Sequence, residues 1–266
     1  MPPRALETHY EPNRRLAEVK GLTGYNCGYA QPGDQSFADH QRSLVWRLLG
    51  DTAISQDSTV IDIGCGIGGP AEWVVQRYRP RRLIGLEFCR SSVAAAESRC
   101  RESTIRPAFL QGDAHRLPFA DASADVILCL ESALHYADKD AFVGECTRVL
   151  RPGARLCLGD ITTRHKWLFT PLAILNRLPS QFNSHIYLWS PNDYRAAFQR
   201  HGLELLRYED ASRPVARSLA NGLTELKRLS QRVLHGMRGR FAFLAFLQFL
   251  LTNKYLNYDL FTLRRA

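Results

Sequence analysis

The clearest chemical signal in the sequence is a glycine-rich turn that follows an apolar stretch. Residues 60–69 read VIDIGCGIGG, so an apolar run leads into Asp62, Gly64, Gly66 and Gly68. Glycines in such a turn let the backbone fold tightly and lie against a ligand without an intervening Cβ atom. Their spacing differs from the G-x-G-x-x-G pattern of dinucleotide enzymes. The spacing therefore disfavours NAD as the ligand.

Two carboxylates follow the next two apolar stretches, at positions suited to a nucleoside. Glu87 ends the run 83–87, about 20 residues beyond the glycines, where a carboxylate can accept hydrogen bonds from both hydroxyls of a ribose. Asp113, in the sequence Gln111-Gly112-Asp113-Ala114, can accept a hydrogen bond from the amino group of adenine. The structural alternatives are a helix-entry role for Glu87 and a local backbone cap at Asp113.

The segments that must position these residues alternate between strand and helix. β-prone runs at 58–63, 82–87, 107–111, 124–130 and 155–160 are separated by helical patterns at 70–78, 91–101 and 139–149. This alternation predicts a parallel sheet with helices packed on it. We also expect helices at 36–49 and 190–201, the second begun by Ser190 and Pro191, and strands at 203–208 and 255–263, the last at the sheet edge.

The chain of 266 residues predicts one domain whose segments have different roles. An N-terminal helical arm (1–50) precedes a cofactor-binding core (51–162), and two helical insertions (163–189 and 212–252) are expected to form a lid before the terminal strand (253–266). The apolar stretch 241–251 is about 11 residues long, whereas a spanning helix needs roughly 20. It predicts a buried or pocket-covering helix without stable membrane insertion.

Composition narrows the choice of partners and of cellular compartment. The formal net charge is +9, yet the basic residues are scattered and do not form a stripe interleaved with aromatics, so we expect no nucleic-acid partner. The seven cysteines lie mostly in apolar runs and indicate neither a disulfide framework nor a zinc site, and we expect no bound metal. Because residues 1–10 lack the apolar core of a signal peptide, we expect a cytoplasmic protein.

Taken in order, the motifs resemble those of class I S-adenosylmethionine-dependent methyltransferases. The resemblance covers about residues 58–160 and is carried by Asp62-x-Gly64-x-Gly66-x-Gly68, Glu87, Gly112-Asp113-Ala114, Leu130-Glu131-Ser132 and Val149-Leu150-Arg151-Pro152-Gly153. It implies an α/β, Rossmann-like, doubly wound and mostly parallel seven-stranded sheet with an antiparallel last strand. It also implies S-adenosylmethionine as cofactor and S-adenosylhomocysteine as product. The residues assigned to the cofactor are Tyr25, Tyr29, Gln41, Asp62, Gly64, Cys65, Gly66, Gly68, Glu87, Phe88, Asp113, Ala114, Leu130 and Glu131.

Within that family the chain is similar to the branch that contains tocopherol, natural-product sugar and polyketide methyltransferases. The residues that carry this likeness are the arm 25–29, Gln41 and the stretch 131–136. The likeness implies that arm aromatics cover the methionine end of the cofactor and that His135 is the general base. Asp160, which ends the fifth β-prone run, is expected to orient His135, to hold an acceptor hydroxyl or to cap the next turn.

The favoured function is methyl transfer to an oxygen atom of a small, apolar or aromatic molecule of secondary metabolism. A homodimer is one of the assemblies that we consider for the protein. Methylation of carbon or nitrogen in a natural product or lipid is the first alternative. An RNA or protein methyltransferase is a second, although Leu130-Glu131-Ser132-Ala133 replaces the usual N-P-P-Y motif. The third is a non-methylating, cyclase-type protein that binds the cofactor on the same fold.

Overall fold

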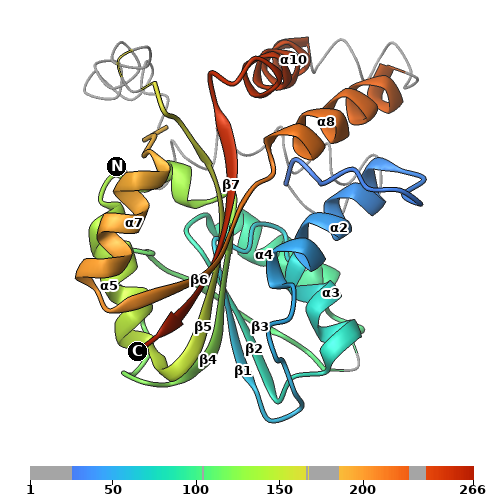
Figure 1. Cartoon of the computed structure of the whole chain (residues 1–266). Coiled ribbons are helices and arrows are strands. Elements are labelled where there is room, and N and C mark those ends of the chain that lie inside the picture. The colour runs from blue at the N-terminus through green and yellow to red at the C-terminus, as the bar shows by residue number, and fades with distance from the viewer. Residues whose placement is uncertain (1–25, 104, 166, 168–185, 228–237) are drawn as a thin grey trace.

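Seven strands form one mixed sheet in the order β3-β2-β1-β4-β5-β7-β6 (Figure 1). The computed structural model describes residues 26–103, 105–165, 167, 186–227 and 238–266. The strands are β1 (Thr59–Ile63), β2 (Arg82–Glu87), β3 (Ala108–Gln111), β4 (Ala124–Leu130), β5 (Leu150–Thr162), β6 (Leu203–Asp210) and β7 (Asn257–Arg265). Strands β1 to β5 are parallel, and β7 is antiparallel to both of its neighbours. The prediction of a Rossmann-like sheet with an antiparallel last strand is confirmed.

The strand order reverses at β1, because the chain first builds outward through β2 and β3 and then returns to place β4 on the other side of β1. In open α/β sheets, ligands bind outside the carboxyl ends of the strands at such a switch point. The ends of β1, β2 and β4 are therefore where a site is expected. They carry the glycine turn, Glu87 and Glu131 respectively.

Helices cover both faces of the sheet (Figure 1). One face is covered by α2 (Phe37–Leu49), α3 (Gly69–Tyr78), α4 (Arg90–Arg99) and α8 (Ser212–Lys227), and the other by α5 (Lys139–Val149) and α7 (Pro191–Arg200). The remaining described helices are η1 (Ala133–His135) and α10 (Arg238–Thr252). Each face has its own buried core, with Leu44 and Leu48 of α2 in one and Phe142 of α5 in the other.

Side-chain caps fix where two of the predicted helices begin. Before α2, the Asp39 N–H donates to Ser36 Oγ, and the Ser36 N–H donates in return to the Asp39 carboxylate. Ser190 and Asp193 form the same reciprocal pair before α7, whose first residue is Pro191. These caps satisfy N–H groups that the first turn of a helix leaves unpaired. The predicted start at Ser190 is confirmed.

The prediction that the last strand lies at the sheet edge is wrong. β7 lies between β5 and β6, and β6 is the outermost strand on that side. Every residue from Asn257 to Leu263 is buried, and Tyr258 packs in one core while Phe261 packs in the other. A strand with apolar aromatic residues on both faces needs cover on both, which an inner position provides.

The two predicted helical insertions are described to different extents. Residues 212–252 contain α8 and α10, whereas most of 163–189 lies outside the described residues. Only one side of α10 is buried, so the prediction of a buried helix at 241–251 holds for Leu247 and Leu251 and fails for Phe243, Phe246 and Phe249. Within the described ranges, no helix is long and apolar enough to span a bilayer.

Candidate active site

The glycine turn joins β1 to α3 beside the ends of β2 and β4. The N–H groups of Gly64 and Cys65 both donate to the carbonyl of Leu86 in β2, at 2.7 and 3.1 Å. Gly64 has a φ of 70°, and a Cβ atom on it would lie 2.3 Å from the side chain of Ser132. Both the backbone conformation and the close approach of Ser132 therefore require glycine there. Gly68 has a φ of 82° and is the N-cap of α3.

Glu87 connects the glycine turn to the start of α4. One oxygen of its carboxylate accepts the N–H of Gly66 at 3.1 Å, and the other accepts the N–H of Cys89 at 2.9 Å. Burial raises the pKa of Glu87, and these two hydrogen bonds oppose the rise. The side chain of Glu87 is nevertheless half-exposed, as is its neighbour Phe88. A carboxylate accepts up to about four hydrogen bonds, so Glu87 retains capacity for a bound hydroxyl.

Asp62 is a buried carboxylate, one oxygen of which lacks a donor among the described residues. Its Oδ2 atom has no hydrogen-bond partner there, and the residue is 2% exposed. Burial, followed by the charge of Glu87, raises the pKa of Asp62 to about 7. An unpaired buried carboxylate is costly to a protein, and a cationic ligand would relieve that cost. Asp62 and Glu87 together therefore favour a ligand that carries positive charge.

Asp113 follows β3 and stays accessible to solvent. Its Oδ1 atom accepts the N–H of His115 at 2.9 Å and lies 2.7 Å from His115 Nδ1. Partial burial raises the pKa of Asp113, and the contacts with His115 lower it by more, so the net shift is downward. Because Asp113 is exposed and a carboxylate accepts several hydrogen bonds, an amino group of a ligand can bind there. The next residue, Ala114, is 7% exposed and packs in the core.

Ser132 is a site residue for which the sequence predicted no specific contact. Its hydroxyl donates to the carbonyl of Ile63 at 3.1 Å and accepts the hydroxyl of Tyr136 at 2.9 Å. Ser132 therefore joins the end of β4 to the glycine turn at Gly64. The signal in the sequence is a small polar residue directly after an apolar strand, which is too common to identify this contact by itself.

His135 lies in η1, three residues beyond Ser132. The His135 N–H donates to the carbonyl of Ser132 at 3.0 Å, and the imidazole is half-exposed. The N–H of Tyr187 donates to the carbonyl of Leu134 at 2.7 Å, which brings the segment 186–190 alongside this turn. His135 thus belongs to a turn anchored on one side to the glycine turn and on the other to the segment before α7.

Asp160 supports the His135 turn through the buried side chain of Lys139. It is 0% exposed, and its Oδ2 atom accepts Tyr194 Oη at 2.6 Å and Lys139 Nζ at 3.2 Å. Lys139 is also fully buried and donates to the carbonyl of Ala133, the first residue of η1. Burial lowers the pKa of Lys139, and the charge of Asp160 opposes that shift. The Oδ2 atom of Asp160 thus has Lys139 and Tyr194 as partners, while its Oδ1 atom has no hydrogen-bond partner among the described residues.

Glu131 fastens the N-terminal arm to the sheet. Its Oε1 atom accepts the N–H of Cys27 at 2.6 Å and the hydroxyl of Tyr258 in β7 at 2.7 Å, while Oε2 accepts Cys27 Sγ at 3.2 Å. Burial raises the pKa of Glu131 to about 7, although these donors oppose the rise. The residue also has a φ of 54°, which is unusual for a side chain other than glycine. A carboxyl group with this pKa can take up a proton at neutral pH.

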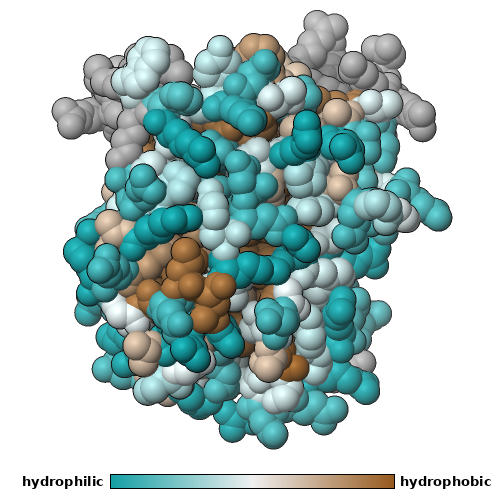
Figure 2. All heavy atoms as spheres, viewed as in Figure 1, coloured by the Kyte–Doolittle hydropathy of each residue, from teal (hydrophilic) through white to brown (hydrophobic). Residues whose placement is uncertain are grey.

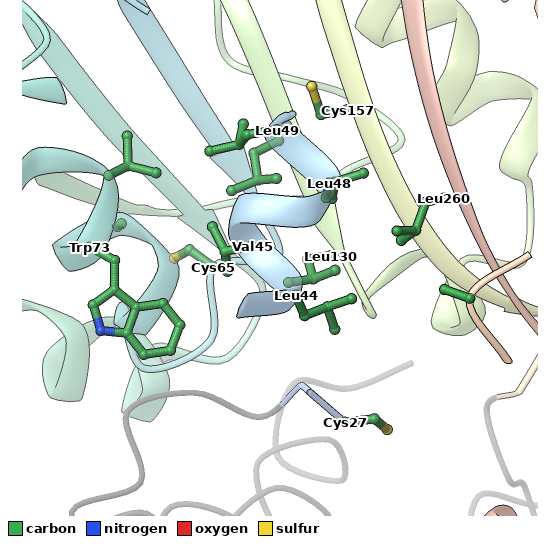
Figure 3. Packing of buried hydrophobic residues seen from close by; sticks show 14 of the residues in the cluster. Cys27, Leu44, Val45, Leu48, Leu49, Cys65, Trp73, Leu130, Cys157 and Leu260 are labelled. Atoms are coloured by element: carbon green, nitrogen blue, oxygen red, sulfur yellow. The ribbon is translucent and has the colours of Figure 1, made fainter. Parts of the chain in front are cut away.

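The other described residues expected at the cofactor make hydrogen bonds or packing contacts within the protein. Gln41 is buried, and its Nε2 atom donates to the carbonyl of Asn26 at 2.8 Å, so it also holds the arm. The hydroxyl of Tyr29 donates to Glu209 at 3.1 Å, near the edge strand β6. The side chains of Cys65 and Leu130 belong to the core on the α2 face (Figure 3), which leaves the backbone of Cys65 to line the turn. Tyr25 lies outside the described residues.

The described residues provide a turn for close backbone contact, two carboxylates suited to a cation and hydroxyls, and a histidine and a carboxyl group suited to proton transfer. No group of three or more potential metal ligands occurs in the parts of the chain that the structure describes.

Comparison with known proteins relates this site to a reaction. A family model for a methyltransferase domain matches residues 61–158. The methyltransferase GfsG of Streptomyces halstedii is 33% identical over 214 residues, covering 79% of this chain and 76% of that protein. The 27-O-demethylrifamycin SV methyltransferase of Amycolatopsis mediterranei is 28% identical, covering 78% of this chain and 76% of its own.

The fold is shared with enzymes of more than one reaction type. The solved structure of the [4+2]-cyclase SpnF superimposes with a TM-score of 0.78 at 21% identity, covering 98% of this chain and 96% of that chain. At that identity the likeness shows the fold alone. The methyltransferase relatives and the residues of the site therefore indicate the reaction.

Proposed function

The chain belongs to the S-adenosylmethionine-dependent methyltransferases, and from this premise we propose that it moves the methyl group to an oxygen atom of a small, apolar molecule. The observation that carries the proposal is the position of His135. Its turn is joined through Ser132 to the glycine turn, so a half-exposed imidazole stands at the carboxyl end of β4, next to the cofactor site. An oxygen acceptor that must lose a proton needs such a group.

The residues present fit S-adenosylmethionine. This cofactor carries a sulfonium cation, an ammonium group and two ribose hydroxyls, whereas Asp62 Oδ2 has no donor among the described residues and Glu87 retains capacity for a hydroxyl. We propose that Glu87 holds the ribose, that Asp113 holds the adenine amino group, and that the backbone of the glycine turn lies against the cofactor. Asp62 then supplies negative charge beneath the positively charged end.

The bound cofactor supplies a methyl group that is activated by a sulfonium cation. The protein must hold the acceptor in line with that methyl group and exclude water, and positioning of this kind contributes several kcal/mol to the lowering of a barrier. We propose that His135 accepts the proton of the acceptor hydroxyl as the oxygen–carbon bond forms. Asp160 and Lys139 act as positioning residues, because Lys139 holds the carbonyl of Ala133 at the start of the His135 turn.

We propose that the arm residues after Tyr25 close the site from the side of β7. Cys27 is bound to Glu131, and Gln41 holds Asn26, so the described part of the arm is fastened directly beside the end of β4. The segments 163–189 and 212–252 would complete an apolar lid, to which α10 would contribute its buried side, with Leu247 and Leu251, and not its exposed phenylalanines. All seven cysteines are buried, which suits the cytoplasm that we propose as its location.

Carbon methylation is the second candidate, and Glu131 is the observation that favours it. Its carboxyl group, with a pKa near neutrality, is next to Ser132 and could remove a proton from an acceptor carbon or stabilise a positive charge there. In that case Glu131 would exchange its bond to Cys27 for one to the acceptor.

The proposal is tested by turnover of labelled S-adenosylmethionine with a panel of acceptors. The panel includes aromatic, polyketide, terpenoid and fatty-acyl compounds with free hydroxyl or carboxyl groups, together with small polar acceptors. We expect turnover among the apolar compounds. Turnover confined to polar acceptors would contradict the proposed substrate class, and binding of the cofactor without turnover of any acceptor would favour a non-methylating protein.

A further inference from the structure

One side of α10 presents aromatic side chains to solvent. Phe243, Phe246 and Phe249 are 51, 58 and 51% exposed, although large apolar side chains are normally buried. Leu247 and Leu251, one helical turn apart on the other side, are 6 and 2% exposed and pack in the core. The helix is thus attached to the protein by its leucines and leaves its phenylalanines outside.

One more exposed aromatic residue adjoins these phenylalanines. Tyr255, 41% exposed, stacks on Phe249 with ring centroids 6.3 Å apart. We call Phe243, Phe246, Phe249 and Tyr255 the aromatic surface. It holds four of the seven large hydrophobic residues that are exposed in the described parts of the chain.

The aromatic surface is concentrated at one end of the molecule. In Figure 2 small hydrophobic areas are visible at the top, where Figure 1 places α10, and a larger hydrophobic area lies lower on the same face. The end that carries α10 is also where the parallel strands terminate and where the candidate active site lies. Large exposed apolar patches on a protein often mark contact surfaces.

Exposed cations lie beside the aromatic surface. Lys254 is exposed directly after α10. The neighbouring helix α8, which packs against α10, exposes Arg213 and Arg217, while the carboxylate of its Glu225 accepts the N–H of Phe37. The whole chain carries a formal charge of +9. An apolar partner that carries negative charge is therefore complementary to this surface.

We propose that the aromatic surface docks on the surface of a membrane that contains anionic lipids, with α10 lying in the plane of the headgroups. A helix of 15 residues is about 22 Å long and suits this orientation, and interfacial helices combine an aromatic or leucine-rich face with flanking cations. A second copy of the chain is the other apolar occupant. A two-fold contact through α10 would bring the cations of one copy near those of the other, whereas anionic headgroups neutralise them.

Docking in this way would place the active site next to the bilayer. The chain leaves α10 at Thr252 and enters β7 at Asn257. The next residue, Tyr258, donates a hydrogen bond to Glu131 at the candidate active site. An apolar acceptor dissolved in the bilayer would reach the site without crossing water. Docking itself does not depend on whether oxygen or carbon is methylated, so it can fail or succeed independently of the proposed function.

Flotation of the full chain with lipid vesicles tests the proposal. We expect the protein to float with vesicles of phosphatidylcholine mixed with phosphatidylglycerol, to remain behind with phosphatidylcholine alone, and to be released by salt. The variant F243S/F246S changes two exposed side chains and should retain S-adenosylmethionine binding, but its affinity for the anionic vesicles should fall at least about tenfold. The control Leu206→Ser alters an apolar side chain of β6 that is 40% exposed and should float like the original protein.

Three results would overturn the proposal. The first is failure of the original protein to bind anionic vesicles, and the second is equal binding by F243S/F246S. The third is a dimer in light scattering that F243S/F246S converts to a monomer, because the aromatic surface would then be covered by a second copy. Calorimetry with S-adenosylmethionine shows whether the variant is folded. Should it fail to bind the cofactor, Lys254→Glu replaces it and is expected to weaken vesicle binding several-fold.

Discussion

The carboxylate of Glu87 accepts the backbone N–H of Gly66 at 3.1 Å, so the end of β2 holds the turn that follows β1. The same side chain accepts the N–H of Cys89 and fixes the start of α4. A single residue therefore orders two walls of the cofactor site before the cofactor arrives. Ordering of this kind reduces the entropy lost when the ligand binds.

Replacing Glu87 by glutamine should weaken cofactor binding more than it weakens the fold. The amide has one acceptor oxygen in place of two and carries no charge, so either the glycine turn or the ribose loses a charge-assisted hydrogen bond. We expect the Kd for S-adenosylmethionine, measured by calorimetry, to rise on the order of 10- to 100-fold. The control Glu97→Gln, on the exposed side of α4, should leave the Kd unchanged. Equal Kd values for the two variants would contradict the role of Glu87.

Variants of two glycines with similar φ angles distinguish the cost of conformational strain from the cost of steric overlap. Gly64 and Gly153 have φ values of 70° and 79°, but a Cβ atom at Gly153 would meet nothing within 4 Å, whereas one at Gly64 would lie 2.3 Å from Ser132. Gly153→Ala should lower the free energy of unfolding by about 1 kcal/mol through strain alone. Gly64→Ala should lower it by about 2–4 kcal/mol, because overpacking is added. Urea unfolding gives both values, and equal losses would show that contact with Ser132 is unimportant.

Cofactor binding should depend on pH through Asp62. Burial and the charge of Glu87 raise the pKa of Asp62 from 3.8 to about 7 in the free protein. A cationic ligand favours the ionised carboxylate, so binding lowers this pKa and releases a proton. Affinity should therefore increase as the pH rises through about 7, by roughly tenfold for each unit of pKa change on binding.

Calorimetry in two buffers of different ionisation enthalpy measures that proton directly. Asp62→Asn should remove both the proton release and the pH dependence near neutrality. Proton uptake on binding would contradict the prediction. The sign for folding is opposite: the folded protein holds this proton more tightly than the unfolded chain, so the contribution of Asp62 to stability falls as the pH rises from 3.8 to about 7.

His135→Ala should separate catalysis from cofactor binding. If His135 accepts the proton of the acceptor, kcat should fall on the order of 100-fold, while the Kd for S-adenosylmethionine stays within about twofold of its original value. The matched control is His201→Ala, at the end of α7, which removes a histidine that pairs with Asp140. Full turnover by His135→Ala would exclude the general-base role, and Glu131→Gln would then be the next variant to test.

The buried pair of Lys139 and Asp160 should matter for stability. Lys139→Met leaves Asp160 buried and without its cation, which costs about 3–5 kcal/mol when a buried pair is broken from one side. The double variant Lys139→Met/Asp160→Leu should recover part of that loss. In contrast, Arg200→Met breaks a pair with Asp140 on the surface and should cost at most about 1 kcal/mol. A small loss for Lys139→Met in thermal or urea unfolding would refute the importance of the buried pair.

Local patterns in the sequence were sufficient to predict most of the fold. The glycine turn, the carboxylate at Glu87 and the cap at Ser190 each depend on residues close together in the chain, and the strand and helix alternation identified the sheet. The position of β7 could not be predicted in this way, because it depends on which strands cover Tyr258 and Phe261. That is decided by packing of segments far apart in the sequence.

The support of the site was also beyond local reasoning. Glu131 was expected at the cofactor, but its bonds to Cys27 and Tyr258 span 104 and 127 residues. Asp160 was expected near His135, and the structure pairs it with Lys139, a lysine that a helix pattern alone would place on the surface. The burial of a charged residue can be predicted only when the residue that pairs with it is known.

The identity of the methylated atom is the most direct test of the proposed reaction. Cofactor carrying a ¹³C-labelled methyl group is incubated with the protein and the acceptor that the panel identifies, and the product is examined by NMR. We expect the label to appear as a methyl group bonded to oxygen and to depend on His135. A label bonded to carbon, or product formed without transfer of the label, would contradict the proposal of a histidine-assisted O-methyltransferase.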